Sequence, residues 1–198
     1  MPAILIAIGL IFAVVAIPGC TAARSYNALM TRDELVSSSQ RQMLSAYKKR
    51  ADLIPNAAAT VEKYASHEKG VLAEVAQARA KATHITLPEN ATPEQIAAFA
   101  QHQSQLSGAL GRLLMVSEQY PNLKADAGFL QLQRDLKDIE QQATAARNKY
   151  IREIAAFNVN VRTFPNSLVA SLFGVKTKPQ LEFDDAKAIE SSPRVFQK

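Results

Sequence analysis

Residues 92–120 read TPEQIAAFAQHQSQLSGALGRLLMVSEQY and carry the clearest helical pattern in the chain. One set of residues recurs at alternating spacings of three and four: Ile96, Phe99, Gln103, Leu106, Leu110, Leu113, Ser117 and Tyr120. This spacing places their side chains on one face of an α-helix. Thr92, Pro93 and Gln95 form a capping box with proline at the first helical position, which predicts where the helix begins.

Three further segments follow the same rhythm, at residues 26–47, 57–82 and 129–157. The spacing is closer to a heptad repeat than to the ideal helical period, which favours shallow crossing angles between helices. The chain is 7% aromatic and has no Trp, which suits helices better than strands. We therefore predict an all-α protein, an elongated antiparallel bundle of about four long helices preceded by an N-terminal transmembrane helix.

Turn signals divide these segments. Residues 84–91 are expected to form a loop before the capping box. Pro121 and Asp126 predict a tight connection, with Asp126 capping the last long helix. Pro55 leaves two alternatives open, because it either kinks one long helix or separates the first helix from the second.

Residues 1–23, MPAILIAIGLIFAVVAIPGCTAA, contain no charged side chain and are long enough to cross a bilayer as a helix. We expect an uncleaved transmembrane anchor. Two alternatives are a cleaved secretory signal and a lipoprotein signal ending at Cys20, where residues 17–20 (IPGC) loosely match a lipobox. A signal peptide normally begins with basic residues, and their absence here favours the anchor.

Basic residues follow the apolar segment, beginning with Arg24 and Arg32. Positive residues tend to stay on the cytoplasmic side, so the expected topology is a single-pass membrane protein with a cytoplasmic body. A lipidated Cys20 would place the body in the periplasm instead. The balance of 23 basic and 18 acidic residues gives a net charge of +5, which suits an anionic membrane surface and does not indicate nucleic-acid binding.

The C-terminal part has a different character. Residues 163–175 contain no charged side chain. Pro165 is placed to start a short apolar helix, and Gly174 is placed to stop it. This helix is expected either to cap the open end of the bundle or to contact a membrane interface or a second protomer. Residues 176–198 form a charged tail without periodicity, for which we expect irregular structure.

Polar residues interrupt the apolar faces. Asp33, Gln40, Glu68 and Gln103 occupy in-register positions, and Arg112, Glu118, Glu140 and Arg147 lie beside such positions. Buried charge is costly unless paired, so these residues are expected to form pairs that fix the helix register. For Glu68 the expected partner is Arg112 or Arg147. The alternative is a polar groove that receives a peptide.

Several strings along the chain resemble those of the LemA family of bacterial membrane-associated proteins. They are residues 26–27 (YN), 50–56 (RADLIPN), 67–68 (HE), 105–113 (QLSGALGRL), 118–125 (EQYPNLKA), 146–147 (AR) and 164–165 (FP). The resemblance runs from about Tyr26 to Gly174. It implies a helical bundle, here residues 24–162, after a membrane segment in the bacterial inner membrane. It implies no established enzymatic activity.

The residues themselves offer little chemistry. His67 and Glu68 are adjacent and point about 100° apart on a helix, whereas a di-iron bundle needs Glu and His three residues apart. Cys20 lies in the anchor without a base beside it, and no phosphate-binding glycine loop is present. We therefore predict no catalytic, cofactor-binding or metal residues, no cofactor, and no enzyme activity.

Three classes of function come into question for this chain: a self-associating membrane scaffold, a peptide-binding or adaptor module, and a hydrolytic or metal-dependent enzyme. Alanines such as Ala76, Ala78, Ala80 and Ala82 permit close helix approach, which favours a homo-oligomer. The interpretation we adopt is a membrane-anchored scaffold. Its alternative is a module that binds a peptide or protein and acts with a membrane protease or translocation system.

Overall fold

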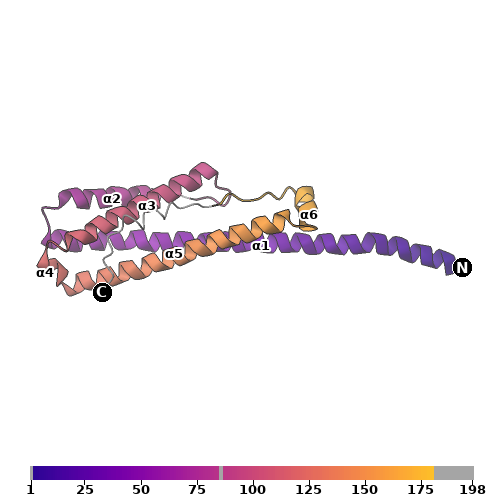
Figure 1. The fold of residues 1–198 in the computed structure, drawn as a ribbon, viewed down its shortest axis with the longest axis horizontal. Coiled ribbons are helices and arrows are strands. Elements are labelled where there is room, and N and C mark those ends of the chain that lie inside the picture. The colour runs from indigo at the N-terminus through magenta and orange to yellow at the C-terminus, as the bar shows by residue number, and fades with distance from the viewer. Residues whose placement is uncertain (1, 85–86, 181–198) are drawn as a thin grey trace. The chain divides into compact units, whose positions relative to one another are not determined.

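The computed structural model describes the backbone of residues 2–84 and 87–180, with side chains described from residue 19 onward. Every regular element in this part of the chain is a helix. The helices are α1 (Pro2–Tyr64), α2 (Lys69–His84), α3 (Pro93–Val116), α4 (Pro121–Lys124), α5 (Ala127–Arg162) and α6 (Asn166–Phe173) (Figure 1). The predicted all-α helical bundle is confirmed at this level.

The chain divides into two compact units. Unit 1 contains the chain up to Ser39 together with Lys149–Lys178, and unit 2 contains Gln40–Asn148 with Pro179 and Gln180. The long helices α1 and α5 each contribute to both units.

Unit 2 is an antiparallel four-helix arrangement. The Tyr64 hydroxyl, at the end of α1, donates to Asp126, just before α5, and Arg50, fourteen residues earlier, donates to Glu140, fourteen residues later. These matching steps in opposite directions show that α1 and α5 run antiparallel. The helices α2 and α3 lie side by side (Figure 1), and the Gln103 side chain on α3 reaches the backbone of Ala82 on α2.

One cluster in the core of unit 2 is made mainly of small and branched aliphatic residues, together with the buried ring of Phe129. Its most enclosed members are Ala57, Val61, Ala65, Val75, Leu106, Ala109, Leu113, Leu123 and Phe129, each fully buried. Alanines on α1, α2 and α3 bring the helices close, and the leucines fill the remaining space.

Helix α1 passes through Pro55 without interruption, which resolves the two alternatives in favour of one long helix. Proline has no N–H, so the backbone carbonyl of Ala51, four residues earlier, loses its usual helical partner. That carbonyl accepts a hydrogen bond from Arg79 Nε on α2 at 2.9 Å. A side chain from the neighbouring helix therefore replaces the bond that the proline removes.

The predicted second helix, residues 57–82, is wrong as a continuous element. Helix α1 ends at Tyr64, the chain turns through residues 65–68, and α2 begins at Lys69. The apolar spacing continues through this turn because both helices of the hairpin pack apolar side chains into the same core. Val61 on α1 and Val75 on α2 both lie there. Spacing alone cannot distinguish such a hairpin from a straight helix.

Three other predicted helix ends are confirmed. Thr92 and Gln95 form the capping box at the start of α3. The backbone N–H of Phe129 donates to the Asp126 carboxylate at 2.9 Å at the start of α5. Gly174 ends α6 with φ of 70°, a left-handed conformation that favours glycine.

Unit 1 contains α6, the part of α1 up to Ser39 and the part of α5 from Lys149 onward. Arg32 on α1 lies 3.8 Å from the Glu153 carboxylate on α5, and Lys178 Nζ lies 2.7 Å from Asp33 on α1. The side chain of Asn158 bonds the backbone of Lys178 in both directions, at 2.7 and 2.8 Å. These bonds attach the segment after α6 to α1 and α5.

The predicted anchor, residues 1–23, falls mainly on side chains outside the described residues. Among the residues described, no helix carries an apolar stretch long enough to cross a membrane. Most of the expected charged tail, from residue 181 onward, also lies outside the described residues.

Candidate functional site

The most unusual side chain of unit 2 is Arg50, which is 1% exposed and heads the fully buried side chains by size. Its guanidinium reaches two neighbouring helices. Nη2 donates to the Gln103 side-chain oxygen on α3 at 2.6 Å, and Nη1 donates to Ser107 at 2.9 Å and to the Glu140 carboxylate on α5 at 2.8 Å. One side chain thus connects α1, α3 and α5.

The buried charge of Arg50 is balanced from two directions. Glu140 supplies the compensating anion, and its side chain is 48% exposed, so it keeps part of its hydration. The guanidinium also lies 5.0 Å from the ring centre of Tyr47, a cation–π distance. Arg50 Nε makes no hydrogen bond to any described residue. We call Arg50, Gln103, Ser107 and Glu140 the arginine cluster.

Two buried glutamines, like Arg50, form hydrogen bonds to other elements of unit 2. Gln103 uses its amide nitrogen to donate to the Ala82 carbonyl on α2 at 3.3 Å, while its oxygen accepts from Arg50. Gln40 donates to the carbonyls of Leu87 and Pro88 in the loop before α3, at 3.0 and 3.1 Å. Among the polar residues predicted in or beside the apolar faces, Gln103 and Glu140 bond to neighbouring helices as expected, whereas Gln40 bonds to a loop.

The expected partners of Glu68 are wrong. Its carboxylate accepts a hydrogen bond from the Tyr120 hydroxyl at 3.0 Å, and Arg112 pairs with Glu74, its Nε lying 2.9 Å from the carboxylate. Glu68 lies just before α2 and is half-buried, so water and a neutral phenol suffice to solvate it. A buried cation is not required there.

Two of the tyrosines bond to acids at the same end of unit 2. Hydrogen bonds from the Tyr64 hydroxyl and from the backbone of Phe129 hold the pKa of Asp126 below its usual range. The hydrogen bond to Glu68 raises the pKa of Tyr120, because ionising the phenol would remove the donated proton. On α5, burial raises the pKa of Tyr150.

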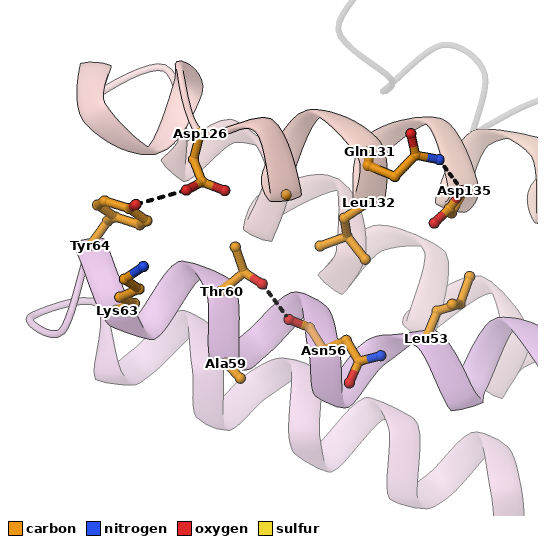
Figure 2. A pocket seen from close by; sticks show the side chains of 11 residues that line it. Leu53, Asn56, Ala59, Thr60, Lys63, Tyr64, Asp126, Gln131, Leu132 and Asp135 are labelled. Carbon is orange, nitrogen blue, oxygen red and sulfur yellow. Dashed lines mark hydrogen bonds between the residues drawn. The ribbon is translucent and has the colours of Figure 1, made fainter.

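An open groove of about 490 Å³ lies between α1 and α5 in unit 2. Figure 2 shows Asn56, Thr60 and Tyr64 on one side and Asp126 and Gln131 on the other, with the Tyr64 hydroxyl directed at Asp126. Leu53 and Leu132 line its apolar part, and Lys63 and Asp135 supply charges of both signs. The lining offers hydrogen-bonding groups over a small apolar floor.

The prediction of no metal or catalytic residues stays a prediction. Among the described residues, no three His, Cys, Asp or Glu side chains gather as a metal site would require. Cys20 is exposed on α1.

The burial of Arg50 was not predicted from the sequence, where Arg50 belongs to a basic run with Lys48 and Lys49. The signal was present, because the steps of three and four that lead to Tyr47 continue through Arg50 and Ile54 to Ala57. All four of these residues are buried. Following the stripe across Pro55 would have predicted both the continuous helix and the buried arginine.

Comparisons with known proteins agree with the residues quoted above. A model of the LemA family matches residues 39–196. Protein LemA of Metamycoplasma hominis is 25% identical over 144 residues, which cover 73% of this chain and 63% of that protein. The chain thus spans less than two thirds of the length of that relative. Because the family match covers most of the sequence, the chain belongs to the LemA family.

Proposed function

We propose that this protein is a membrane-anchored, self-associating helical scaffold of the bacterial envelope without catalytic activity. The observation that carries the proposal is the arginine cluster, in which Arg50 is bonded across helices to Gln103, Ser107 and Glu140. Enzymes commonly direct such polar groups toward a cavity where a substrate binds. Here they fix the register of a bundle, which suits a rigid body that presents its surface to partners.

Membrane attachment is supported by residues 1–23, which carry no charge, and by the basic residues that follow, Arg24 and Arg32. This pattern favours one pass through the inner membrane with a cytoplasmic body. A lipid-modified Cys20 with a periplasmic body is the alternative attachment.

Self-association is supported by the outer face of α2. Ala73, Ala76 and Ala80 follow one another at spacings of three and four and are all exposed, whereas Ala78 and Ala82 face the core. Small exposed side chains let a second helix approach closely without losing side-chain entropy. This face therefore suits a helix from another copy.

Cysteine crosslinking of the full chain in native membranes tests this proposal. In a Cys20→Ser background, Ala76→Cys should give disulfide-linked dimers under mild oxidation, and the matched variant Ala78→Cys, buried on the same helix, should give far fewer. The protein should remain in the membrane pellet after an alkaline wash. Release by that wash would contradict membrane anchoring, and equal absence of dimers in both variants would contradict self-association through α2.

The groove between α1 and α5 favours a second candidate function, a peptide-binding or adaptor module. Asn56, Thr60 and Gln131 offer hydrogen-bonding groups beside Leu132, as an extended peptide would require. A photo-crosslinking amino acid placed at Thr60 should capture a defined partner if this function holds, while the same group at exposed Glu62 should not. Equal labelling at both positions would contradict a groove-specific partner.

A further inference from the structure

Helix α6 and the residues before it expose large apolar side chains. Phe164 is 74% exposed, Leu168 64%, Leu172 79% and Phe173 58%. A soluble domain seldom exposes so many large apolar groups in one short segment. We call these four residues the α6 patch.

The orientation of α6 is fixed by its other face. Val169 and Ala170 are buried in unit 1, so Leu168 and Leu172, four residues apart, point together away from the unit. The left-handed Gly174 ends α6, and the hydrogen bonds between Asn158 and Lys178 hold the chain that follows it. The exposure is therefore built into a well-defined helix.

The α6 patch contacts α1 just after the end of the apolar segment, residues 1–23. The rings of Phe173 and Tyr26 have centres 4.8 Å apart. Tyr26 comes three residues after the end of residues 1–23, which is about 5 Å along a helix axis. If residues 1–23 cross the bilayer, Tyr26 lies at the level of the lipid headgroups, and α6 lies there with it.

The exposed charged residues that flank the patch are basic. Arg162 and Lys176 are exposed and flank the patch in sequence, and Arg24 is exposed two residues before Tyr26. No acidic residue occurs in residues 1–32 or 154–180, and the acids that border these ranges, Asp33 and Glu153, are paired with Lys178 and Arg32. Basic side chains beside exposed apolar groups are the combination that binds an anionic lipid surface. A protein partner would not by itself require this arrangement.

We propose that α6 is an interfacial helix, which inserts Leu168, Leu172 and the flanking phenylalanines into the boundary between headgroups and acyl chains of the membrane that holds α1. This inference rests on the proposed membrane anchoring. The helix gives unit 1 a second contact with the same bilayer, so the unit is held against the surface and does not pivot on a single helix.

The absence of Trp from the sequence makes a direct test possible. The full chain carrying Leu172→Trp is reconstituted into vesicles of phosphatidylglycerol and phosphatidylcholine, with and without bromine on the acyl chains. Met115→Trp is the matched control, because Met115 is an exposed apolar residue of unit 2 at 45%. Bromine quenches indole fluorescence only by close approach. We expect a blue-shifted emission and several-fold stronger quenching at position 172 than at position 115.

Flotation of the same vesicles separates the two proposals. If the protein does not float with lipid, the membrane anchoring fails and this inference fails with it. If it floats and the Trp at 172 emits as in water, or is quenched no more than the Trp at 115, the anchoring stands and the interfacial role of α6 is refuted. A blue shift without quenching by brominated lipid also refutes it and indicates contact with a second copy.

Leu168→Trp provides an independent reporter on the same face of α6. It should show the same blue shift and quenching as Leu172→Trp. Circular dichroism and thermal melting verify that each variant keeps the helical fold, so a change in emission reports the environment of the side chain.

Discussion

Units 1 and 2 differ in where they place charged and large apolar side chains. Unit 2 buries a charged arginine and two glutamines and provides partners for each of them on a neighbouring helix or in a loop. Unit 1 holds its charged bonds near the surface and exposes the apolar α6 patch. A buried polar network favours one internal arrangement of helices, whereas an exposed apolar patch favours contact with something outside the chain.

This difference assigns the two parts separate tasks. The arginine cluster uses its polar groups inside unit 2, so variants there should change folding stability. The α6 patch contributes little to internal packing, so variants there should change what unit 1 contacts. Measurements of unfolding and of membrane contact should therefore respond to different residues.

The largest effect is expected for Arg50→Ala. The change removes a fully buried side chain, leaves a cavity, and strands the Gln103 side-chain oxygen without its donor. We expect a loss of about 3 to 4 kcal/mol in the free energy of unfolding, which lowers the melting temperature by on the order of 10 °C.

Thermal melting by circular dichroism measures this effect in the full chain, with exposed Lys49→Ala as the control from the same basic run. The control should stay within about 0.5 kcal/mol of the parent. If Arg50→Ala melted like Lys49→Ala, the arginine cluster would not hold unit 2 together.

A smaller loss is expected for Glu140→Ala. This variant leaves the buried guanidinium of Arg50 without its anion, but Gln103 and Ser107 remain bonded to it. Because the Glu140 side chain is 48% exposed, water can enter its place, so we expect about 2 kcal/mol rather than the full penalty for a stranded buried charge. Exposed Asp138→Ala on the same helix is the control, and equal melting of the two variants would contradict the assignment.

Glycine substitutions should act in opposite directions in the two units. Gly174→Ala forces a side chain into a left-handed conformation with φ of 70° and should destabilise α6 by about 1 kcal/mol. Gly111→Ala lies inside α3 with open space around it and should stabilise unit 2 by up to about 1 kcal/mol. Chemical denaturation measures both changes, and the same sign for both would contradict the cap at Gly174.

The smallest effect is a dependence on acid. The pKa of Asp126 is lowered in the folded chain, so its contribution to stability is complete above its unfolded pKa, about 4, and is lost as pH falls through the lower folded value. Asp126→Asn keeps the cap and cannot titrate. Melting curves between pH 7 and pH 2 should therefore fall less steeply for this variant, and identical slopes would show that Asp126 does not contribute.

Local signals in the sequence predicted local structure well. Thr92 with Gln95, Asp126 and Gly174 each fixed a helix end by chemistry within a few residues of it, and the structure places helix ends at all three. These positions depend on backbone hydrogen bonds that neighbouring residues satisfy.

Features that depend on distant partners were not predictable in the same way. Pro55 is compatible with a continuous helix because Arg79, on another helix, bonds the carbonyl of Ala51. Arg50 is compatible with burial because its guanidinium bonds to Gln103 and Glu140, both of which lie far away in sequence. The turn at residues 65–68 contains no proline or glycine and preserves the apolar spacing. Each of these features depends on packing that a local pattern does not encode.

The central claim, a scaffold that assembles copies of itself at the membrane, is tested most directly by mixed-isotope crosslinking. Light and heavy-isotope-labelled copies of the full chain are produced together, and their membranes are treated with a lysine crosslinker and analysed by mass spectrometry. For a self-associating scaffold we expect abundant linked peptide pairs that combine one light and one heavy copy. Linked pairs found only within a single isotopic form would show that each chain stands alone and would contradict the scaffold.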